Sequence, residues 1–407
     1  MSLVQSSCFS IPLANKSVHC VVTSPPYWGL RKYAGEQGIE PLGLEPSPER
    51  HIERTVQWAR EVWRVLRDDG VFWLNYGDSY SGSGGENGNA GLGLNTAEQH
   101  GNYRNNPRQR TIAGGNLTMM PHRVALTLQA DGWIVRQDLV WVKPNPMPES
   151  VRGWSFDPEG KLRRGSWRHT RSHEFVFMLT KGMQYWSDQE AVREGYVRPE
   201  EFERQMPAVF GGANKSEGYG TRKHSGNEYT NNLGGRNPRS VLHIPTAPYS
   251  GAHYATYPPA LIAPLILATC PRWCCPVCGQ GWALVVEKQG YEPEVVAVGS
   301  RNVDESRGDK TRKLSGKDYN NQSSSSILGY RPSCDHLHTQ TEAVPGIVFD
   351  PFVGSGTTVM VARQLGRLGI GADISRPYLV EQAITRINSE PKGKWKEQLK
   401  MLQEISN

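Results

Sequence analysis

Long apolar runs are missing from this sequence. No stretch of apolar residues is long enough to span a bilayer, which excludes a transmembrane helix. The opening residues, MSLVQSSCFS, lack the basic, apolar and cleavage-site pattern of a signal peptide, so we expect a cytoplasmic protein. Cysteine is scarce, with 7 among 407 residues, which argues against a secreted scaffold held together by disulfides.

A strong charge imbalance is also lacking. The formal net charge of +6 permits a nucleic-acid partner without requiring one. Glycine and proline, by contrast, are plentiful at 43 and 28 residues, while hydrophobic residues make up 37% of the chain. This composition indicates a soluble globular protein with extended polar loops, and the length allows a full α/β core with an accessory module.

Residues 23–28, with the sequence TSPPYW, follow an apolar run at 18–22 that predicts a strand. Each proline fixes its own φ angle and restricts the residue before it, so this segment has few conformations. The hydroxyl of Ser24 and the carbonyl of Pro25 can accept N–H bonds, and the ring of Tyr27 offers a stacking surface. The segment therefore suits a flat, amine-bearing group, although an ordinary turn at a strand end has the same prolines.

A second motif, FDPFVGSGTT, occupies residues 349–358 near the other end of the chain. It predicts a buried strand, a tight turn and then a helix at 357–365. Gly354 and Gly356 let the backbone approach a ligand closely, and the start of the helix favours an anionic group. A phosphate-binding P-loop is excluded, because no lysine precedes the threonine pair.

Together the two motifs resemble the DNA amino-methyltransferases, which use S-adenosylmethionine. In that family S/D/N-P-P-Y/F is the catalytic loop and D-P-F-x-G-S-G-T-T the cofactor loop, and the order found here is that of the β group. The resemblance covers most of the chain. It implies an α/β, Rossmann-like methyltransferase fold with a mostly parallel seven-stranded sheet and helices on both faces. It also implies catalytic roles for Ser24, Pro25, Pro26 and Tyr27.

The residues between the motifs alternate between helical and strand patterns. Asp69-Gly70 is expected to separate the first helix from its strand. Asp78 follows that strand in a GDSY sequence that also resembles the family. Because active sites of open α/β sheets lie at the carboxyl ends of strands, Asp78 is a candidate catalytic residue, with a turn aspartate as the alternative. Helices are expected at 49–67, 117–130 and 259–268, and strands at 71–76, 133–142, 172–180, 347–349 and 368–372.

Asp373 ends the last of these strands, where an acidic residue suits a ribose diol. The family has its ribose-binding acid at the matching place. The segment HYATYP at 253–258 resembles another family segment that helps to hold the cofactor. The cofactor-binding residues implied in this way are Asp350, Phe352, Gly354, Gly356, Thr357, Thr358, Asp373, Tyr254 and Thr256.

Candidate DNA contacts come from two passages. The passage at 132–150, ending WVKPNPMPES, is similar to a family segment that lies close to bound DNA. The stretch at 161–171 is the most basic of the chain and includes a tryptophan, which suits backbone contact with stacking, although a solvated basic loop is the alternative. The candidates are Lys143, Arg163, Arg164, Trp167 and Arg168.

Five of the seven cysteines fall between Cys270 and Cys334, which favours metal binding over disulfides. Cys275-x-x-Cys278-Gly is typical of a zinc knuckle, and Cys334 with a nearby histidine would complete a tetrahedral site. Four protein ligands leave no open position, so one structural Zn²⁺ is predicted, with unrelated thiols as the alternative. The predicted ligands are Cys275, Cys278, Cys334 and His336, and the substitutes are Cys270, Cys274 and His338.

These expectations also divide the chain into regions. The catalytic half spans 1–193, with a polar loop insert at 79–116 and a basic insert at 154–171. Target recognition is assigned to 194–239, the cofactor-binding half to 240–272 and 344–390, a zinc-ribbon-like insert to 273–343, and a C-terminal tail to 391–407.

The resemblance implies methyl transfer from S-adenosylmethionine to the exocyclic amine of a base flipped out of duplex DNA. Serine at the first motif position resembles the cytosine-N4 members, with adenine-N6 as the alternative. RNA or protein-glutamine methylation is more distant, because those enzymes usually carry the cofactor loop first. A DNA-binding zinc protein on an inactive fold is a further alternative. Expected partners are double-stranded DNA and a cognate restriction endonuclease, with no membrane, and the chain is expected to be a monomer or homodimer.

Overall fold

The computed structural model describes residues 2–29, 42–81, 112–146, 148–149, 153–194, 237–246, 256–288, 325–336 and 339–406. The chain forms two compact units. The first comprises Met1–Val192, Arg239–Trp282 and Pro332–Asn407, and the second comprises Arg193–Pro238 and Ala283–Arg331. Tyr254, His338 and most of the predicted regions at 79–116 and 194–239 lie outside the described residues, so the expectations for them stay predictions.

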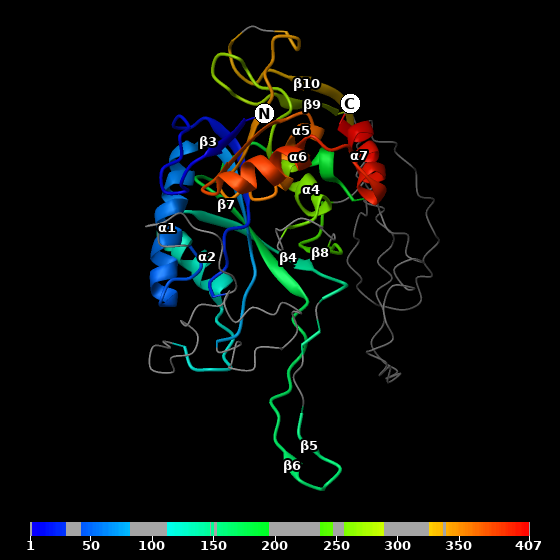
Figure 1. The fold of residues 1–407 in the computed structure, drawn as a ribbon. Helices are drawn as coiled ribbons and strands as arrows, with labels where there is room; N and C mark the ends of the chain where they lie inside the picture. The colour runs from blue at the N-terminus through cyan, green and yellow to red at the C-terminus, as the bar shows by residue number, and fades with distance from the viewer. Residues whose placement is uncertain are drawn as a thin grey trace, which may run out of the picture. The chain divides into compact units, whose positions relative to one another are not determined.

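An eight-stranded sheet forms the centre of the first unit (Figure 1). All neighbouring strands are parallel except that β7 runs antiparallel to both β3 and β4. The mostly parallel α/β sheet is thereby confirmed, with one strand more than the seven expected. Two of the eight strands were not among those placed from the sequence: β1, which has four residues and pairs with β12, and β8, which has three residues and pairs with β4. The strand order is β1 (Ser2–Gln5), β12 (Leu368–Asp373), β11 (Ile347–Asp350), β2 (Val18–Thr23), β3 (Leu66–Tyr76), β7 (His173–Thr180), β4 (Ile134–Val142) and β8 (Val241–His243).

The central strands send alternate side chains into two separate cores. Val21 of β2 and Phe72 of β3 belong to one core, whereas Val22 and Trp73 belong to the other. Successive side chains of a strand point to opposite faces of a sheet, so unbroken apolar runs require both faces to be covered.

Helices cover both faces, as expected. Helices α1 and α2 contribute to the core that contains Val21, and α4 and α5 to the core that contains Val22. The side chain of Ser47 accepts a hydrogen bond from the Arg50 N–H, and Pro48 begins α1, which is a typical helix start. The helices are α1 (Pro48–Val65), α2 (Met120–Ala130), α4 (Pro259–Thr269), α5 (Thr357–Gln364), the π-helical turn η5 (Tyr378–Ala383), α6 (Ile384–Ile387) and α7 (Gly393–Ser406).

The boundary between α1 and β3 differs from the expectation. The helix ends at Val65 and the strand begins at once with Leu66, so Asp69 and Gly70 lie inside β3. The pairing of β3 with β2 is irregular there, because Val18 pairs with Leu66 but Cys20 pairs with Val71. A Cβ at Gly70 would lie 2.7 Å from Leu66 Cδ1 and 2.9 Å from the His19 carbonyl oxygen. Gly70 therefore allows β2 and β3 to pack closely. The start of β3 depends on this packing, and the local Asp-Gly signal did not predict it.

The residues expected to form a C-terminal tail include helix α7. Leu399 is buried in the core beside α4, and the indole of Trp395 donates a 2.9 Å hydrogen bond to the Gln364 side chain. This segment is therefore part of the first unit. Among the described residues, no helix combines the length and apolar character needed to cross a membrane.

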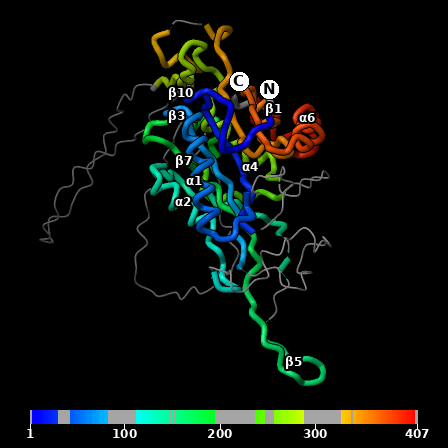
Figure 2. The backbone as a smooth tube through the Cα atoms, turned by 60° about the vertical axis from the view of Figure 1, so that its left-hand side comes forward, coloured from blue at the N-terminus to red at the C-terminus, as the bar shows by residue number. Residues whose placement is uncertain are grey.

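Two small antiparallel hairpins complete the described structure. Strands β5 (Ser155–Phe156) and β6 (Leu162–Arg163) pair within the first unit, and their hairpin projects away from the sheet in both views (Figures 1 and 2). Strands β9 (Ala283–Lys288) and β10 (Ser325–Arg331) pair in the second unit. The basic residues of the predicted insert at 154–171 thus lie on and after the β5–β6 hairpin.

Candidate functional site

The predicted catalytic and cofactor motifs meet at one edge of the sheet. Strands β2, β3, β11 and β12 are parallel, and β4 runs the same way because β7 is antiparallel to both β3 and β4. Their carboxyl ends therefore share an edge, and the loops that follow them carry the two motifs. Ligand sites of open α/β sheets lie at such an edge.

A chain of hydrogen bonds holds the TSPPYW loop. The hydroxyl of Ser24 donates to the hydroxyl of Tyr27 over 2.9 Å, and Tyr27 in turn donates to Glu174 Oε2 over 2.8 Å. The Asn75 amide donates to Ser24 Oγ, to Tyr27 and to Glu174 over 3.3, 2.7 and 2.9 Å. Since a carboxylate only accepts hydrogen bonds, it sets the direction of every hydroxyl proton in the chain.

Glu174 is held in its ionised form. Burial acts to raise the pKa of this carboxyl, but the charge of Lys143 and hydrogen bonds from Lys143, Asn75 and Tyr27 lower it below its usual range. The ammonium of Lys143 contacts Glu174 Oε1 and also lies 4.6 Å from the centre of the Trp141 ring. Lys143, predicted to meet a DNA phosphate, is thus paired with a carboxylate beside the catalytic loop.

The ring of Tyr27 is fixed by its neighbours. It stacks on Tyr76 with 4.9 Å between ring centres and 26° between ring planes. A Cβ at Gly77 would lie only 2.7 Å from Tyr27 Cε2, so this position accepts no side chain without moving the ring. Tyr76 also contacts His51, whose Nδ1 lies 2.7 Å from the buried carboxylate of Glu45. The predicted stacking residue therefore has little freedom to move.

Asp350 lies at the centre of a second buried network. Its carboxylate accepts hydrogen bonds from the Thr23 hydroxyl over 2.5 Å, the Thr358 hydroxyl over 2.6 Å and the Tyr257 hydroxyl over 3.1 Å. Only 2% of Asp350 is exposed. Burial raises its pKa, and the hydrogen bonds from its partners act in the opposite direction. Because Thr23 directly precedes Ser24, this network joins the predicted cofactor loop to the catalytic loop.

Asp373 faces the turn of the cofactor motif. One of its carboxylate oxygens accepts from the Gly354 N–H over 3.0 Å, and the other accepts from the Ser375 N–H over 2.9 Å. Asp373 is partly buried, and its burial raises its pKa, against the effect of these backbone bonds. Gly356 has a φ of +85°, which glycine adopts readily. The predicted ribose-binding acid and the glycine turn thus lie together.

The other cofactor candidates surround this turn. Phe352 packs edge-on against Trp58 with 5.0 Å between ring centres. Thr357 is buried in the first turn of α5, and Thr256 directly precedes Tyr257. Their roles in binding a cofactor stay predictions.

Asp78 makes structural contacts. Its Oδ1 accepts hydrogen bonds from the Thr118 hydroxyl over 2.5 Å and from the Met120 N–H over 3.1 Å, at the start of α2. Its side chain is fully buried, and Oδ2 lies 3.8 Å from Arg171. These contacts match the turn-aspartate alternative, and a catalytic role for Asp78 stays a prediction.

The DNA-binding candidates fall into two sets. Arg163 and Trp167 are 69% and 62% exposed, and Arg164 lies over the ring of Trp154 at 5.3 Å. Arg168, in contrast, forms a 2.8 Å ion pair with Glu149 and lies over the Tyr80 ring. Arg163 also pairs with Asp157 at 3.3 Å, and contact of the first set with DNA stays a prediction.

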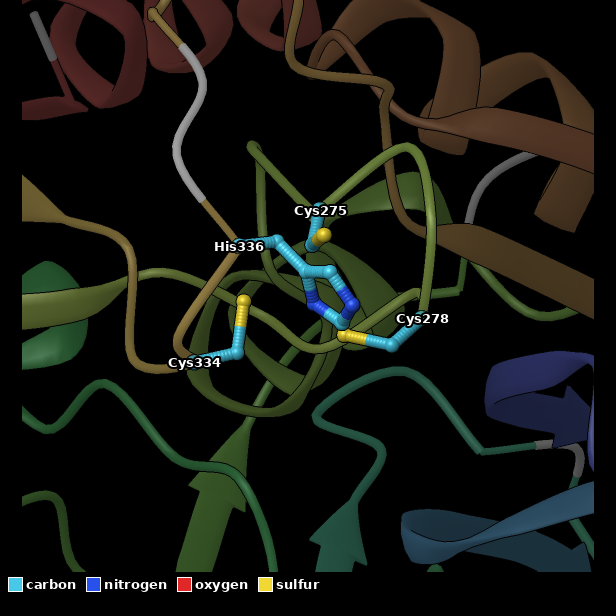
Figure 3. Close-up of side chains that lie close together, drawn as sticks. All are labelled: Cys275, Cys278, Cys334 and His336. Carbon is cyan, nitrogen blue, oxygen red and sulfur yellow. The ribbon is translucent and has the colours of Figure 1, made fainter.

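The predicted metal ligands converge, as Figure 3 shows. Cys275 and Cys278 come from one segment and Cys334 and His336 from another, and their ligand atoms all lie within 4.8 Å of one another. Cys270 and Cys274 are buried outside this cluster. The predicted set of four is the one that the fold brings together.

Sequence reasoning missed several residues of the site. Thr23 and Tyr257 each stand next to a motif residue that was predicted, and this adjacency was the only signal. Asn75 is the last residue but one of the strand that precedes Asp78, which is a weak signal of the same kind. Glu174 has no local signal at all, because it lies 147 residues from Tyr27 in an ordinary apolar strand pattern.

Comparison with known proteins shows the family of this chain. Residues 18–273 and 338–384 match the N6_N4_Mtase family, described as DNA methylase. The Type II methyltransferase M.Cfr9I of Citrobacter freundii is 40% identical over 257 residues, which cover 63% of this chain and 68% of that protein. The Type II methyltransferase M.SmaI of Serratia marcescens is 35% identical over 374 residues, which cover 90% of this chain and 84% of that protein.

A solved structure of the PvuII DNA methyltransferase (cytosine-N4-specific) aligns with 99% of this chain and 91% of its own length, at 14% identity and a TM-score of 0.47. The family assignment rests on sequence. The family match covers more than half of the chain, and M.SmaI is similar over most of its length. Both the catalytic motif and the cofactor motif lie inside the matched residues. The chain therefore belongs to the N6/N4 family of DNA methylases.

Proposed function

We propose that this member of the family transfers a methyl group from S-adenosylmethionine to the N4 amine of a cytosine flipped out of duplex DNA. The observation that carries the proposal is the direction of the hydrogen bonds at Ser24. Its proton is donated to Tyr27, whose own proton is donated to the ionised Glu174. Asn75 uses one lone pair of the Ser24 hydroxyl, and the second lone pair is an acceptor for an incoming N–H group.

An exocyclic base amine is a poor nucleophile, because its lone pair is delocalised into the ring. Ser24 Oγ and the adjacent Pro25 carbonyl accept its two N–H groups and so localise the lone pair on nitrogen. As the new bond forms, one amine proton passes to Ser24, the Ser24 proton to Tyr27, and the Tyr27 proton to Glu174. The ammonium of Lys143 keeps Glu174 ionised and ready to accept it.

S-adenosylmethionine, when bound, supplies a methyl group on a sulfonium, so the C–N bond forms as the C–S bond breaks and a neutral thioether leaves. Asp373 suits the ribose diol, because its partly exposed carboxylate is already oriented by the N–H groups of Gly354 and Ser375. The network around Asp350 keeps this turn at a constant distance from Ser24. In-line transfer depends on such positioning.

The projecting hairpin supplies the DNA contacts in this proposal. Trp154, Phe156 and Trp167 are 66%, 71% and 62% exposed, which is unusual for large apolar side chains. Arg163 and Arg164 lie among them. Aromatic rings interleaved with arginines suit stacking on bases together with phosphate contact. The hairpin leaves the sheet after β4, at the edge that carries Ser24, so duplex held by it lies next to the catalytic loop.

Serine at the first position of the motif favours cytosine over adenine. A neutral hydroxyl replaces the carboxylate or amide of other members, and the cytosine-N4 members resembled by this sequence carry it. The alternative within the same chemistry is N6 of adenine. Intracellular duplex DNA is the substrate that this function requires. A cognate restriction endonuclease is a further proposed partner, and the chain is proposed to act as a monomer or homodimer.

The test is product identification. The purified protein is incubated with S-adenosylmethionine and unmethylated duplexes of varied sequence, and the DNA is digested to nucleosides for mass spectrometry. N4-methylcytosine is expected, and it disappears in Ser24→Ala but persists in Ser10→Ala, a change at an exposed serine outside the site. N6-methyladenine would overturn the choice of base. Absence of any methylated nucleoside, with an active control enzyme, would overturn the reaction.

A further inference from the structure

We propose that Cys275, Cys278, Cys334 and His336 bind a structural Zn²⁺ that fastens the long insert between α4 and β11 to the amino ends of β2 and β3. This inference is independent of the methyl-transfer proposal, since none of its residues lies at the catalytic edge. Its role is to hold both ends of the insert against the sheet.

The cluster has the composition and size of a zinc site. The three thiols and one imidazole have ligand atoms that all lie within 4.8 Å of one another. Tetrahedral zinc with Zn–S bonds of about 2.3 Å requires neighbouring ligand atoms about 3.7 Å apart, so a contraction of about 1 Å or less suffices. Thiolate and imidazole ligands favour zinc over Mg²⁺ or Ca²⁺, which prefer oxygen. With four protein ligands the ion has no position for substrate, which makes it structural.

The Cys275–Cys278 turn has the backbone of a metal knuckle. The N–H of Val277 points to Cys275 Sγ at 3.4 Å, and the N–H of Gly279 donates to the Cys275 carbonyl over 2.8 Å. Gly279 has a φ of +70°, which closes the turn tightly. The neighbouring Cys274 instead contacts His19 Nε2 at 3.4 Å and lies outside the cluster.

His19 of β2 joins this turn to the sheet. Its Nδ1 accepts a 3.0 Å hydrogen bond from the N–H of Ile347, the first residue of β11. Nε2 must then carry the ring proton, and it donates to the Gly279 carbonyl over 2.8 Å. One imidazole therefore connects β2, β11 and the knuckle.

Arg67 of β3 provides a second connection. Its guanidinium donates a 3.0 Å hydrogen bond to the Cys278 carbonyl and is itself oriented by Asp69 at 2.7 Å. A Cβ at Gly279 would lie 2.9 Å from Arg67 NH1, so the glycine also lets the arginine approach. The end of the turn, at Cys278 and Gly279, is thus held by residues at the starts of the neighbouring strands β2 and β3.

The knuckle and the catalytic loop lie at opposite ends of β2. His19 is the second residue of this strand and Thr23 is the last, which places them about 13 Å apart along an extended chain. The metal therefore cannot touch the reacting base. Its effect on the active site, if removed, would act through the position of β2 and β11.

The ion also closes the insert at its root. Cys278 and Cys334 flank the stretch Ala283–Arg331, which belongs to the second unit. Without metal, the two segments meet through backbone hydrogen bonds between Cys274 and Val344, at 2.7 and 3.0 Å. A shared metal ion adds a link between the Cys275–Cys278 segment and the Cys334–His336 segment, whatever the arrangement of the residues inserted between them. Binding of the ion also stabilises the folded chain, because it closes a long loop.

Metal content is the first test. Full-length protein prepared without chelators or nickel columns is analysed for metals, and one zinc per chain is expected. Cys278→Ser should lose the zinc, whereas Cys274→Ser, at the adjacent cysteine outside the cluster, should keep it. Wild-type protein that binds no zinc after reconstitution, that holds iron in its place, or that depends equally on Cys274 would overturn the site.

Two further measurements cover variants that fail to fold. Cobalt substituted into the wild-type chain should give the visible absorption of a tetrahedral cobalt–thiolate centre, and its absence would overturn the ligand set. Hydrogen exchange of the wild type, with and without a chelator, tests the fastening. Faster exchange at the Ile347 and Gly279 amides is expected after zinc removal, and unchanged exchange there would overturn that role. None of these readouts depends on methylation, so failure of one proposal is distinguishable from failure of the other.

Discussion

The hydroxyl of Tyr27 donates a 2.8 Å hydrogen bond to Glu174, a carboxylate 147 residues further along the chain. The contact exists because β7 is the antiparallel strand of the sheet. Its first residues reach the edge where the neighbouring strands end, so Glu174, near its start, faces the loop that follows β2. Lys143, just beyond the end of β4, pairs with it at the same edge. The reversed strand thus brings a charged pair to the catalytic loop.

Replacing Glu174 by glutamine should slow methyl transfer. The neutral amide no longer accepts a proton and can donate to Tyr27, which reverses the direction of the hydrogen bonds at Ser24. A loss of about 100-fold or more in kcat is expected, because a positioned proton acceptor contributes about 10²–10⁴-fold, with little change in KM for DNA. Single-turnover kinetics measure it.

The control for that variant is Glu53→Gln, at an exposed carboxylate on α1. It should leave the rate unchanged. Equal rates for Glu174→Gln and wild type would rule out a proton relay through Glu174.

Replacing Lys143 by methionine should change the pH dependence. In the wild type, burial raises the pKa of Glu174 and Lys143 lowers it, with the lower value prevailing. A carboxyl with a depressed pKa stays ionised until the pH falls through that depressed value, so activity persists above it. The stability gained from the pair is complete above the ordinary carboxyl pKa and is lost as the pH falls from there through the depressed value. Without Lys143, burial is opposed only by hydrogen bonds, and the pKa rises.

The acid limb of the kcat–pH profile should therefore move to higher pH in Lys143→Met. Lys16→Met, at an exposed lysine paired with Asp68, is the control and should not move it. A profile that coincides with that of the wild type would show that Lys143 does not set the charge of Glu174.

Replacing Gly77 by alanine should displace the stacking ring. The added Cβ would lie 2.7 Å from Tyr27 Cε2 and 3.2 Å from Glu174 Cδ, closer than side-chain atoms approach without a shift. A misplaced catalytic group costs up to about 100-fold in rate, so a clear loss of kcat is expected with S-adenosylmethionine affinity retained. Gly182→Ala, where nothing lies within 4 Å, is the matched control, and equal losses in both variants would contradict the steric explanation.

Removing the arginines of the hairpin should weaken DNA binding. Arg163→Ala and Arg164→Ala should each reduce the slope of log affinity against log salt by about 1, as expected for one phosphate contact. Trp167→Ala should cost about 1–3 kcal/mol of binding free energy if its ring stacks on a base. Fluorescence anisotropy over a salt series measures both.

The control for charge is Lys400→Ala on α7, which removes an exposed lysine far along the chain from the hairpin. Salt slopes for the arginine variants that match this control would show that the hairpin does not contact phosphate.

Local patterns in the sequence carried much of the fold. Apolar runs placed β2, β3, β4, β7, β11 and β12 within a few residues. Helical patterns placed α1 and α2, and the segments HYATYP and FDPFVGSGTT placed the helices that follow them, α4 and α5. The exceptions have two causes. β1 and β8 have four and three residues, too few for a pattern, and the start of β3 depends on its pairing with β2, where Gly70 closely approaches His19.

The sequence by itself determined the chemistry of this protein. A proline-constrained TSPPYW loop, a glycine turn before a helix, an acid at a strand end and a Cys/His set with knuckle spacing all act through short-range geometry, which the residues themselves dictate. Only the tertiary structure decided which side chains orient them. Glu174 at Tyr27, Tyr257 at Asp350, and His19 between the metal knuckle and β11 are contacts across 93 to 328 residues of sequence. Such contacts arise from the order and direction of the strands, and these are set by burying both faces of one sheet.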